Sequence, residues 1–331
     1  MPGFPRLRDA YDVVVVGGGH AGLQTAVKTA LFHYTAALVD RGPKYSRSYY
    51  APRMSNIPGS ADDISGHTLL DRQIAAVRRF EDRIGYFTPA RAVSARRTDV
   101  GFEVEFDWLK QRSVARGKVL VLAMGVVDRI PLIGGEIKTI FPWANFGIVN
   151  FCLFCDGHEL SGHSVAVLGH DTYAVRSALD IRHWGPTSVT LLTHGEPLLP
   201  GIPDADRAPL VAELAAAGIP VGELEIVGVD GIRENLLTLR FSDGSVRTFD
   251  KAFSALGWYD MNQTIPKQLG AAFDPEGFVL TDEDCRVLAA GSNEAIPGLY
   301  CVGDQRNGWN QIPEAWATAE RAAIHAYASY L

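Results

Sequence analysis

The hydrophobic pattern at the start of the chain predicts a strand, a tight turn and a helix. The run YDVVVV at residues 11–16 is rich in β-branched residues, and three consecutive glycines beginning at Gly17 follow it. Apolar residues then recur at helical spacing over residues 20–32. A second apolar run, TAALVD at residues 35–40, predicts the next strand. This order of elements is typical of a nucleotide-binding βαβ unit.

The glycines of the turn have the spacing of a dinucleotide-binding site. Gly17, Gly19 and Gly22 form the pattern Gly-x-Gly-x-x-Gly between strand and helix. Glycine at these positions lets backbone amides and the helix N-terminus approach a pyrophosphate. Asp40 ends the second strand, 21 residues after Gly19, where a carboxylate can accept both hydroxyls of an adenosine ribose. We predict nucleotide binding, and this unit alone leaves FAD and NAD open.

The end of the chain favours FAD for this unit. A short strand predicted at residues 299–302 ends in Gly303 and Asp304. In two-domain flavoproteins an acidic residue at such a place commonly binds the ribityl chain of FAD. We therefore predict that both ends of the chain contribute to one FAD site.

Length and composition narrow the class of protein. The 331 residues allow about two domains of roughly 150 residues each. With 47% hydrophobic and 21% charged residues, the chain has the composition of a soluble globular protein. A net charge of −7 and scattered arginines predict no nucleic-acid binding. No apolar run approaches 18 residues and the N-terminus has no signal-peptide pattern, so we expect a cytoplasmic protein without transmembrane spans.

A pair of cysteines is the strongest candidate for chemistry. Cys152 and Cys155 are separated by two residues, and Asp156 follows directly. Zinc needs about four ligands, and only His158 and His163 lie near, so we predict no metal site. A structural disulfide across so short a loop would stabilise little. Redox chemistry fits best, since a helix N-terminus can lower the pKa of such a thiol from about 8.5 to between about 3.5 and 7.5.

The other two cysteines, Cys285 and Cys301, show no partner spacing. Four cysteines are too few for a secreted disulfide scaffold. We expect Cys285 and Cys301 to be buried and unreactive.

Several short segments together resemble the low-molecular-weight thioredoxin reductase family. They occur in the order and spacing of that family and cover nearly the whole chain. The segments are VVVGGGHAG, NIPG at Asn56–Gly59, LAMG at Leu122–Gly125, CLFCDG, SALG and YCVGDQ. The most specific of them is Cys-x-x-Cys-Asp-Gly before a βα unit.

The resemblance implies a fold and an assembly. The fold class is α/β, with two Rossmann-like, three-layer domains of the FAD/NAD(P)-binding type. The FAD-binding domain is discontinuous and comprises residues 1–122 and 248–331. The inserted module, residues 123–247, resembles an NADPH domain and carries the redox dithiol. The family is usually homodimeric.

The resemblance also implies roles for individual residues. Cys155 would face the flavin, Cys152 would exchange with the thiol of a partner, and Asp156 would shuttle the proton of each exchange. Met124 departs from the family, which usually has Thr there. From the glycine turn and the resemblance together, the residues predicted to bind FAD are Gly17, Gly19, Gly22, Asp40, Asn56, Gly125, Gly303, Asp304, Gln311 and Ile312.

The second nucleotide-binding turn, in the inserted module, has lost its pattern. The loop at residues 169–174 reads GHDTYA and keeps only the first glycine. Asp171 stands at the place of the second glycine, where its carboxylate would face a phosphate. Residues 193–196, THGE, replace the arginines expected to bind a 2′-phosphate. We predict that this module keeps its fold and has lost pyridine-nucleotide binding.

Without NADPH, the flavin must exchange electrons with another donor or acceptor. Three branches similar to this chain lack the nucleotide motifs: ferredoxin-dependent flavin thioredoxin reductases, dithiol oxidases that act on small molecules, and diflavin-linked disulfide oxidoreductases. We favour the third, because Trp258, Tyr259, Trp309 and Trp316 lie near positions expected to approach the flavin. Their rings could stack on a second FAD.

The loop before NIPG and the kind of activity both stay open. Five residues of this loop are further candidates for the flavin pocket, although a solvated loop accounts for them equally well: Tyr45, Arg47, Tyr49, Tyr50 and Arg53. A flavin-bearing redox sensor that binds a partner without turnover is the hypothesis from another class. Neither the dithiol or disulfide substrate nor the direction of electron flow follows from the sequence.

Overall fold

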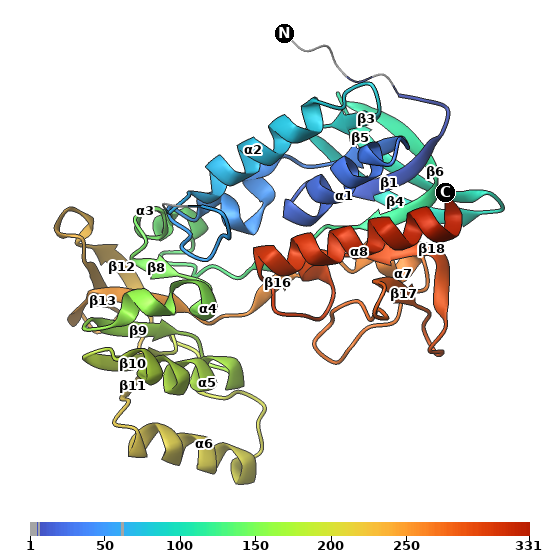
Figure 1. Cartoon of the computed structure of the whole chain (residues 1–331). Coiled ribbons are helices and arrows are strands. Elements are labelled where there is room, and N and C mark those ends of the chain that lie inside the picture. Colours follow the sequence, from blue (N-terminus) through green and yellow to red (C-terminus); the bar gives the residue numbers. More distant parts are fainter. Residues whose placement is uncertain (1–4, 6, 61–62) are drawn as a thin grey trace.

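The chain folds into two lobes. The computed structural model describes residue 5, residues 7–60 and residues 63–331, apart from the side chains of residues 259 and 260. Figure 1 shows that the first lobe combines both ends of the chain and that the second lobe contains the middle of the chain. Both lobes contain parallel strands covered by helices, so the predicted α/β class is confirmed.

The first lobe is built on a sheet of eight strands. Its main path runs in the order β17-β18-β6-β1-β2-β3, and β5 and β4 extend from β6. The pairs that β1 makes with β2 and β6, and that β6 makes with β18, are parallel. The strands are β1 (Tyr11–Val16), β2 (Ala36–Val39), β3 (Ile84–Phe87), β4 (Ala90–Thr98), β5 (Gly101–Trp108), β6 (Gln111–Leu122), β17 (Arg286–Leu288) and β18 (Ala295–Cys301).

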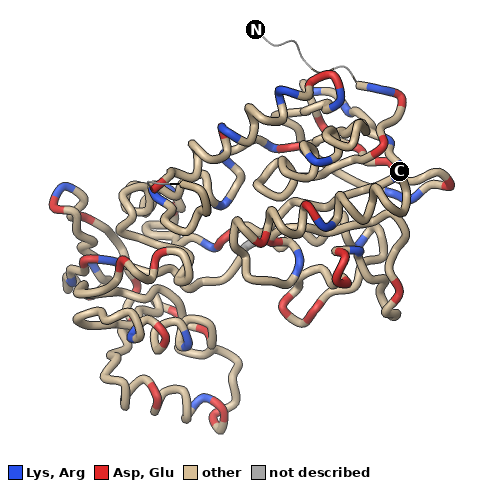
Figure 2. Tube along the Cα trace, in the orientation of Figure 1, with Lys and Arg blue, Asp and Glu red and all other residues tan. Residues whose placement is uncertain are grey.

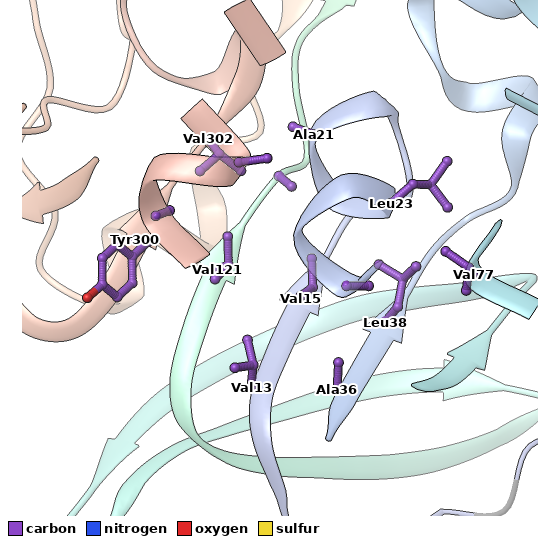
Figure 3. Packing of buried hydrophobic residues seen from close by; sticks show 14 of the residues in the cluster. Val13, Val15, Ala21, Leu23, Ala36, Leu38, Val77, Val121, Tyr300 and Val302 are labelled. Atoms are coloured by element: carbon purple, nitrogen blue, oxygen red, sulfur yellow. The ribbon is translucent and has the colours of Figure 1, made fainter. Parts of the chain in front are cut away.

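The core of the first lobe explains why the opening apolar run forms a central strand. Successive side chains of a strand point to opposite faces, and β1 is buried on both. Val13 and Val15 pack on the helical face with Ala21 and Leu23, as Figure 3 shows. Val14 and Val16 pack on the other face. A β-branched run without polar alternation is therefore suited to this buried parallel position.

Four helices accompany this sheet, and small residues let two of them approach closely. They are α1 (His20–Leu31), α2 (Gly66–Arg78), α7 (Thr264–Gln268) and α8 (Ile312–Tyr330). Helix α8 lies beside α1 in Figure 1. The buried positions of α8 are Ala315, Thr318, Ala319, Ala322, Ala323 and Ala326. This row of small side chains brings the first turn of α8 next to the first turn of α1.

The second lobe contains a parallel sheet of five strands in the order β11-β10-β9-β15-β8. Its strands are β8 (Val149–Asn150), β9 (Ser164–Leu168), β10 (Ser188–Leu192), β11 (Val221–Gly222) and β15 (Lys251–Ser254). The boundary predicted at residue 248 therefore falls before the last strand of this sheet. The reason is that β15 pairs with both β8 and β9.

Two other layers cover this sheet. Val165 and Val167 of β9 pack with α5 and α6, while Ala166 and Leu168 pack with an antiparallel sheet of three strands. That sheet contains β12 (Ile226–Asp230), β13 (Leu237–Phe241) and β14 (Val246–Phe249). The helices of this lobe are α3 (Phe141–Asn145), α4 (Leu153–Asp156), α5 (Thr172–Ile181) and α6 (Asp204–Ala216).

Two short antiparallel strands join the lobes. Strand β7 (Val127–Asp128) leads out of the first lobe and pairs with β16 (Trp258–Asp260), which leads back. The remaining short 3₁₀ helices are η1 (Pro43–Tyr45), η2 (Arg47–Tyr50), η3 (Ile137–Thr139), η4 (Gly157–Leu160), η5 (Arg182–Trp184), η6 (Ile232–Glu234) and η7 (Gly303–Gln305).

Charge is distributed evenly over both lobes. Figure 2 shows Lys and Arg interspersed with Asp and Glu along the trace, without a basic stripe. Within the described residues, no helix combines the length and the apolar character needed to cross a membrane.

Candidate functional site

The two cysteines of the CLFC segment form a disulfide at the start of a very short helix. Cys152 is the N-cap residue of α4, and its carbonyl oxygen accepts hydrogen bonds from the amides of Cys155 and Asp156, at 3.1 and 3.0 Å. Helix α4 has only four residues. The pair is oxidised in the structure, so the lowered thiol pKa stays a prediction.

The disulfide meets side chains from both ends of the chain. Gln311 Nε2 lies 3.4 Å from Cys152 Sγ and 3.5 Å from Cys155 Sγ. Asn56 Nδ2 donates a hydrogen bond of 2.9 Å to Gln311 Oε1. The structure thus brings together four of the residues predicted for the redox and flavin sites.

Asp156 lies in an environment that suits proton transfer. Burial, with a smaller contribution from the neighbouring carboxylate of Glu159, raises the pKa of its carboxyl to about 6. Glu159 is itself held by Arg53, at 2.6 Å, and by Lys251, at 3.1 Å. A carboxyl group with a pKa near 6 can bind or release a proton close to neutral pH.

Two exposed aromatic rings stand beside the disulfide. Phe154, between the two cysteines, is 70% exposed, and Trp309 is 73% exposed. Their rings meet edge to face with centroids 6.4 Å apart. The sequence analysis did not select Phe154, although an apolar residue inside a Cys-x-x-Cys segment is a usable signal.

The first glycine turn fits a dinucleotide. A Cβ on Gly22 would lie 1.8 Å from the carbonyl oxygen of Gly17, so this position needs glycine for the helix to pack on the turn. On Gly19, in contrast, the nearest atom to an added Cβ would be Ser46 Oγ at 3.9 Å. Gly19 is the N-cap residue of α1, and no side chain caps this helix end. Its amides can therefore bind a pyrophosphate.

Asp40 lies directly beside this turn. Its carboxylate accepts hydrogen bonds from the Gly18 amide, at 3.0 Å, and from the Tyr86 hydroxyl, at 3.1 Å. Burial raises the pKa of Asp40. The backbone of Arg41 and of Gly42 also hydrogen-bonds this carboxylate and opposes the shift. Tyr86, on β3, is a partner that the sequence analysis missed.

His20, the first residue of α1, is a buried histidine next to the same turn. Its Nδ1 lies 2.5 Å from Gln73 Oε1, and its Nε2 lies 2.7 Å from Ser48 Oγ. Because the Gln73 oxygen is an acceptor, the proton sits on Nδ1 and Ser48 donates to Nε2. Burial lowers the pKa of His20. The end of the helix is thus lined by a neutral imidazole.

Asp304, predicted to contact the ribityl chain, is engaged in an ion pair. Arg47 Nη1 lies 2.7 Å from Asp304 Oδ2. The same guanidinium group binds Asp128 through Nε, at 2.7 Å, and Nη2, at 2.9 Å. Arg47 therefore links three elements: η2, the connecting strand β7, and η7, which follows β18. Asp304 Oδ1 has no part in this contact and can accept a hydrogen bond from a cofactor.

Three other predicted flavin residues lie around the same loops. Gly125 adopts a left-handed backbone with φ 60°, and its carbonyl oxygen accepts a hydrogen bond of 2.8 Å from Asn262. The amide of Gly303 donates to Thr318 Oγ1 on α8, at 3.1 Å. Ile312 packs partly buried against the cluster that contains Met54. These contacts are compatible with the predicted roles and do not test them.

The second turn does not fit a dinucleotide. Asp171 is the N-cap residue of α5, and its Oδ1 accepts a hydrogen bond of 2.9 Å from the Ala174 amide. A carboxylate therefore occupies the helix end that a pyrophosphate would need. A Cβ on Gly169 would lie 2.4 Å from the carbonyl oxygen of Ala255, so this position still needs glycine for the turn to pack against that residue.

His194 does not replace the missing arginines. Its Nδ1 accepts a hydrogen bond of 2.9 Å from the Ile226 amide, and its Nε2 donates to the Leu132 carbonyl oxygen at 3.0 Å. Both ring nitrogens are thus used by the backbone. A phosphate at this place would find no free donor on the ring.

The aromatic residues predicted to stack on a second FAD have separate ring partners. Trp258 meets Phe278 at 5.3 Å, and Trp309 meets Phe154 at 6.4 Å. Trp316 meets the imidazole of His20 at 6.3 Å. The side chain of Tyr259 lies outside the described residues. The ring contacts give no support to a stack made by the three tryptophans.

The remaining cysteines take no part in the site. Cys285 and Cys301 are buried and free, as predicted. Burial raises the pKa of Cys285 to about 11 and raises that of Cys301 as well. Among the described residues, no group of three or more His, Cys, Asp and Glu side chains could hold a metal ion.

Comparison with known proteins shows the family of the chain. A family model described as pyridine nucleotide-disulphide oxidoreductase matches residues 11–323. A thioredoxin reductase of Listeria innocua is 23% identical over 309 residues, which cover 89% of this chain and 86% of the relative.

Solved structures share the fold. Thioredoxin reductase from Streptococcus pyogenes superimposes with a TM-score of 0.77 at 21% identity, covering 97% of this chain and 98% of the other. An oxidoreductase from Agrobacterium tumefaciens gives a TM-score of 0.72 at 25% identity, with coverage of 97% and 98%.

Proposed function

Since the chain belongs to the pyridine nucleotide-disulphide oxidoreductase family, we propose that it is an FAD-dependent disulfide oxidoreductase that works without NADPH. Membership of this family implies FAD and disulfide redox chemistry. The finer proposal is that Cys152 and Cys155 carry electrons between a dithiol substrate and the flavin, with the substrate oxidised to a disulfide.

One observation carries the NADPH-independent part of the proposal. The carboxylate of Asp171 caps α5 by accepting the Ala174 amide proton. A dinucleotide bound there could not place its pyrophosphate against this helix end. Its phosphates would also lie against the negative charge of Asp171. The backbone-bonded ring of His194 supports the same interpretation, because it offers no cation for a 2′-phosphate.

The first lobe would hold the FAD. Gly17, Gly19 and Gly22 shape the turn for the pyrophosphate, and Asp40 would bind the adenosine ribose. The other residues proposed to contact the cofactor are Asn56, Gly125, Gly303, Asp304, Gln311 and Ile312. When bound, FAD supplies a two-electron acceptor beside the disulfide.

The residues of the chain then have separate tasks. We propose that Cys152 receives the substrate thiol and that Cys155 is the cysteine on the flavin side. Asp156 would hold the proton that leaves the substrate thiol, which its raised pKa allows. The exposed rings of Phe154 and Trp309 flank the path of the substrate.

The proposal needs one FAD per chain. A second FAD, as in diflavin-linked enzymes, remains a prediction that the ring contacts of the tryptophans do not support. The cytoplasmic location and the homodimer implied by the resemblance also remain predictions.

An anaerobic titration tests the proposed function. The purified flavoprotein is mixed with NADPH or with dithiothreitol, and the flavin absorbance near 450 nm is followed. Dithiothreitol should bleach the flavin, whereas NADPH at ordinary concentrations should leave it oxidised. Cys155→Ser should block the bleaching by dithiothreitol and retain bound flavin. Rapid bleaching by NADPH would contradict the proposal.

A further inference from the structure

One side-chain donor contacts both sulfur atoms of the disulfide. Gln311 Nε2 lies 3.4 Å from Cys152 Sγ and 3.5 Å from Cys155 Sγ. Gln311 Oε1 lies 3.7 Å from Cys155 Sγ, but a disulfide sulfur has no hydrogen to donate to it. In the oxidised protein the amide group is therefore the donor.

A neighbouring amide fixes the orientation of this donor. Asn56 Nδ2 donates to Gln311 Oε1 at 2.9 Å, which turns the carbonyl oxygen toward Asn56 and Nε2 toward the sulfurs. The Asn310 carbonyl oxygen, at 3.3 Å from Nε2, also accepts from this amide group. Gln311 precedes α8, and Asn56 belongs to the NIPG segment of the first lobe. Both residues are thus supplied by the lobe opposite the disulfide.

The other groups around the disulfide provide little stabilisation for a thiolate. Helix α4 is a single turn. Asp156 and Glu159 are acidic and disfavour a negative charge nearby. Arg53 and Lys251 are both paired with Glu159, at 2.6 and 3.1 Å, and His158 is exposed. None of these five side chains has a hydrogen bond to sulfur in the structure, whereas Gln311 does.

We propose that the side-chain amide of Gln311 is a catalytic group that stabilises the thiolate released when the disulfide is opened. This inference rests on the proposed function. A substrate thiolate attacks Cys152 Sγ and forms a new S–S bond with it. The Cys152–Cys155 bond breaks, and its electron pair stays on Cys155 Sγ. Nε2 of Gln311 then donates to a full negative charge, and such hydrogen bonds are stronger than those to neutral acceptors. Asn56 acts through Gln311 and is a positioning residue.

The pH dependence of cysteine alkylation tests this role. The flavoprotein is reduced anaerobically with a phosphine, treated with iodoacetamide between pH 5 and pH 10, and analysed by peptide mass spectrometry. Gln311→Leu should raise the midpoint of the Cys155 profile by about one pH unit, a tenfold loss of thiolate, because a hydrogen bond to a charged group is lost. Gln111→Leu, the same substitution at an exposed strand end, should leave the profile unchanged. The buried Cys285 and Cys301 serve as internal unreactive references.

A double-mutant cycle separates an electrostatic role from a structural one. Asn56→Ala should shift the midpoint upward by less than Gln311→Leu does, and should add nothing when Gln311 is already Leu. A Gln311→Leu profile that superimposes on the wild type would overturn the inference. If Gln311→Leu does not fold, an unchanged profile in Asn56→Ala has the same force.

The outcome is independent of the anaerobic titration. If dithiols fail to reduce the wild-type flavin but the alkylation midpoint moves, the proposed function fails and the role of Gln311 toward the sulfurs stands. If dithiols reduce the flavin and the midpoint does not move, only the role of Gln311 fails.

Discussion

The carboxylate of Asp171 caps helix α5 by accepting the hydrogen of the Ala174 amide, with 2.9 Å between Oδ1 and N. The bond satisfies one of the free amides at the helix end and places a negative charge against the positive end of the helix dipole. The same side chain therefore stabilises the second lobe and occupies the helix end at which a phosphate would bind.

Replacement of this cap should weaken the second lobe without restoring coenzyme binding. Asp171→Ala should lower the free energy of unfolding by about 1 kcal/mol, measured with urea, because the cap is lost. Asp171→Asn keeps an accepting oxygen and should lie close to the wild type. Neither variant should bind NADPH in calorimetry, since no cation has been added for the 2′-phosphate. Tight binding by Asp171→Ala would show that the carboxylate alone excludes the coenzyme.

Two glycines of the first turn should differ in what they contribute. In Gly22→Ala the new methyl group would meet the Gly17 carbonyl oxygen at 1.8 Å, so the protein itself should be strongly destabilised. In Gly19→Ala the added methyl group has no protein atom nearer than 3.9 Å. That variant should fold as apoprotein and retain much less FAD, because the methyl group lies where the pyrophosphate would approach. Flavin content and urea unfolding of the apoproteins separate the two effects. Full flavin occupancy in Gly19→Ala would contradict the predicted FAD site.

Burial of Asp156 should make stability depend on pH. Its pKa is raised from 3.8 in the unfolded chain to about 6 in the folded protein. The contribution of this group to the free energy of unfolding is complete below about pH 4. It is lost as the pH rises through 6. Between pH 4 and pH 7 the free energy of unfolding of the wild type should therefore fall by up to about 3 kcal/mol more than that of Asp156→Asn. The difference in unfolding free energy between the two proteins, measured from pH 4 to pH 8, should follow this curve.

A flat difference would mean that Asp156 ionises at its ordinary pKa, which would remove the support for its role in proton transfer. The rate of exchange with a dithiol provides a second check, because Asp156→Asn should lose a titration near pH 6 that the wild type shows.

The ion pairs of Arg47 should matter for stability and for the cofactor. The side chains of Arg47, Asp128 and Asp304 are 23%, 22% and 20% exposed, so solvent screens these contacts only partly. Arg47→Leu leaves two carboxylates unpaired and should lower the free energy of unfolding by about 2–4 kcal/mol, somewhat less than for a fully buried pair. Arg112→Ala, which removes only exposed ion pairs, should leave the urea midpoint unchanged.

The double variant Arg47→Leu with Asp128→Asn should recover part of this loss, because one of the unpaired charges is removed. If Arg47→Leu has the stability of the wild type, the ion pairs contribute nothing measurable, and Asp304 is free to serve a cofactor alone.

Local features of the fold could be predicted from the sequence because the interacting residues are close along the chain. The apolar run of β1, the glycine turn and α1 follow one another directly, and their order determines their contacts. Asp171, predicted to stand at the place of the second glycine, does lie at the N-terminus of α5, although its role as the cap was not predicted. The CLFC segment needs only two intervening residues to form its disulfide.

Contacts between distant segments could not be predicted in the same way. The amide of Gln311 reaches Cys152 across 159 positions of the sequence, and Arg47 reaches Asp304 across 257. Such contacts depend on how the two lobes lie against each other and on which rotamer each long side chain adopts. The position of β15 could not be predicted for a related reason. This strand follows the predicted boundary at residue 248 but pairs with β9, nearly 90 residues earlier in the chain.

The position of β18 has a consequence for synthesis of the protein in the cell. This strand, Ala295–Cys301, pairs with β6 and completes the sheet that begins with β1. All strands of the second lobe are translated before it. A ribosome-bound chain can therefore finish its middle lobe while the sheet of the first lobe still lacks β17 and β18.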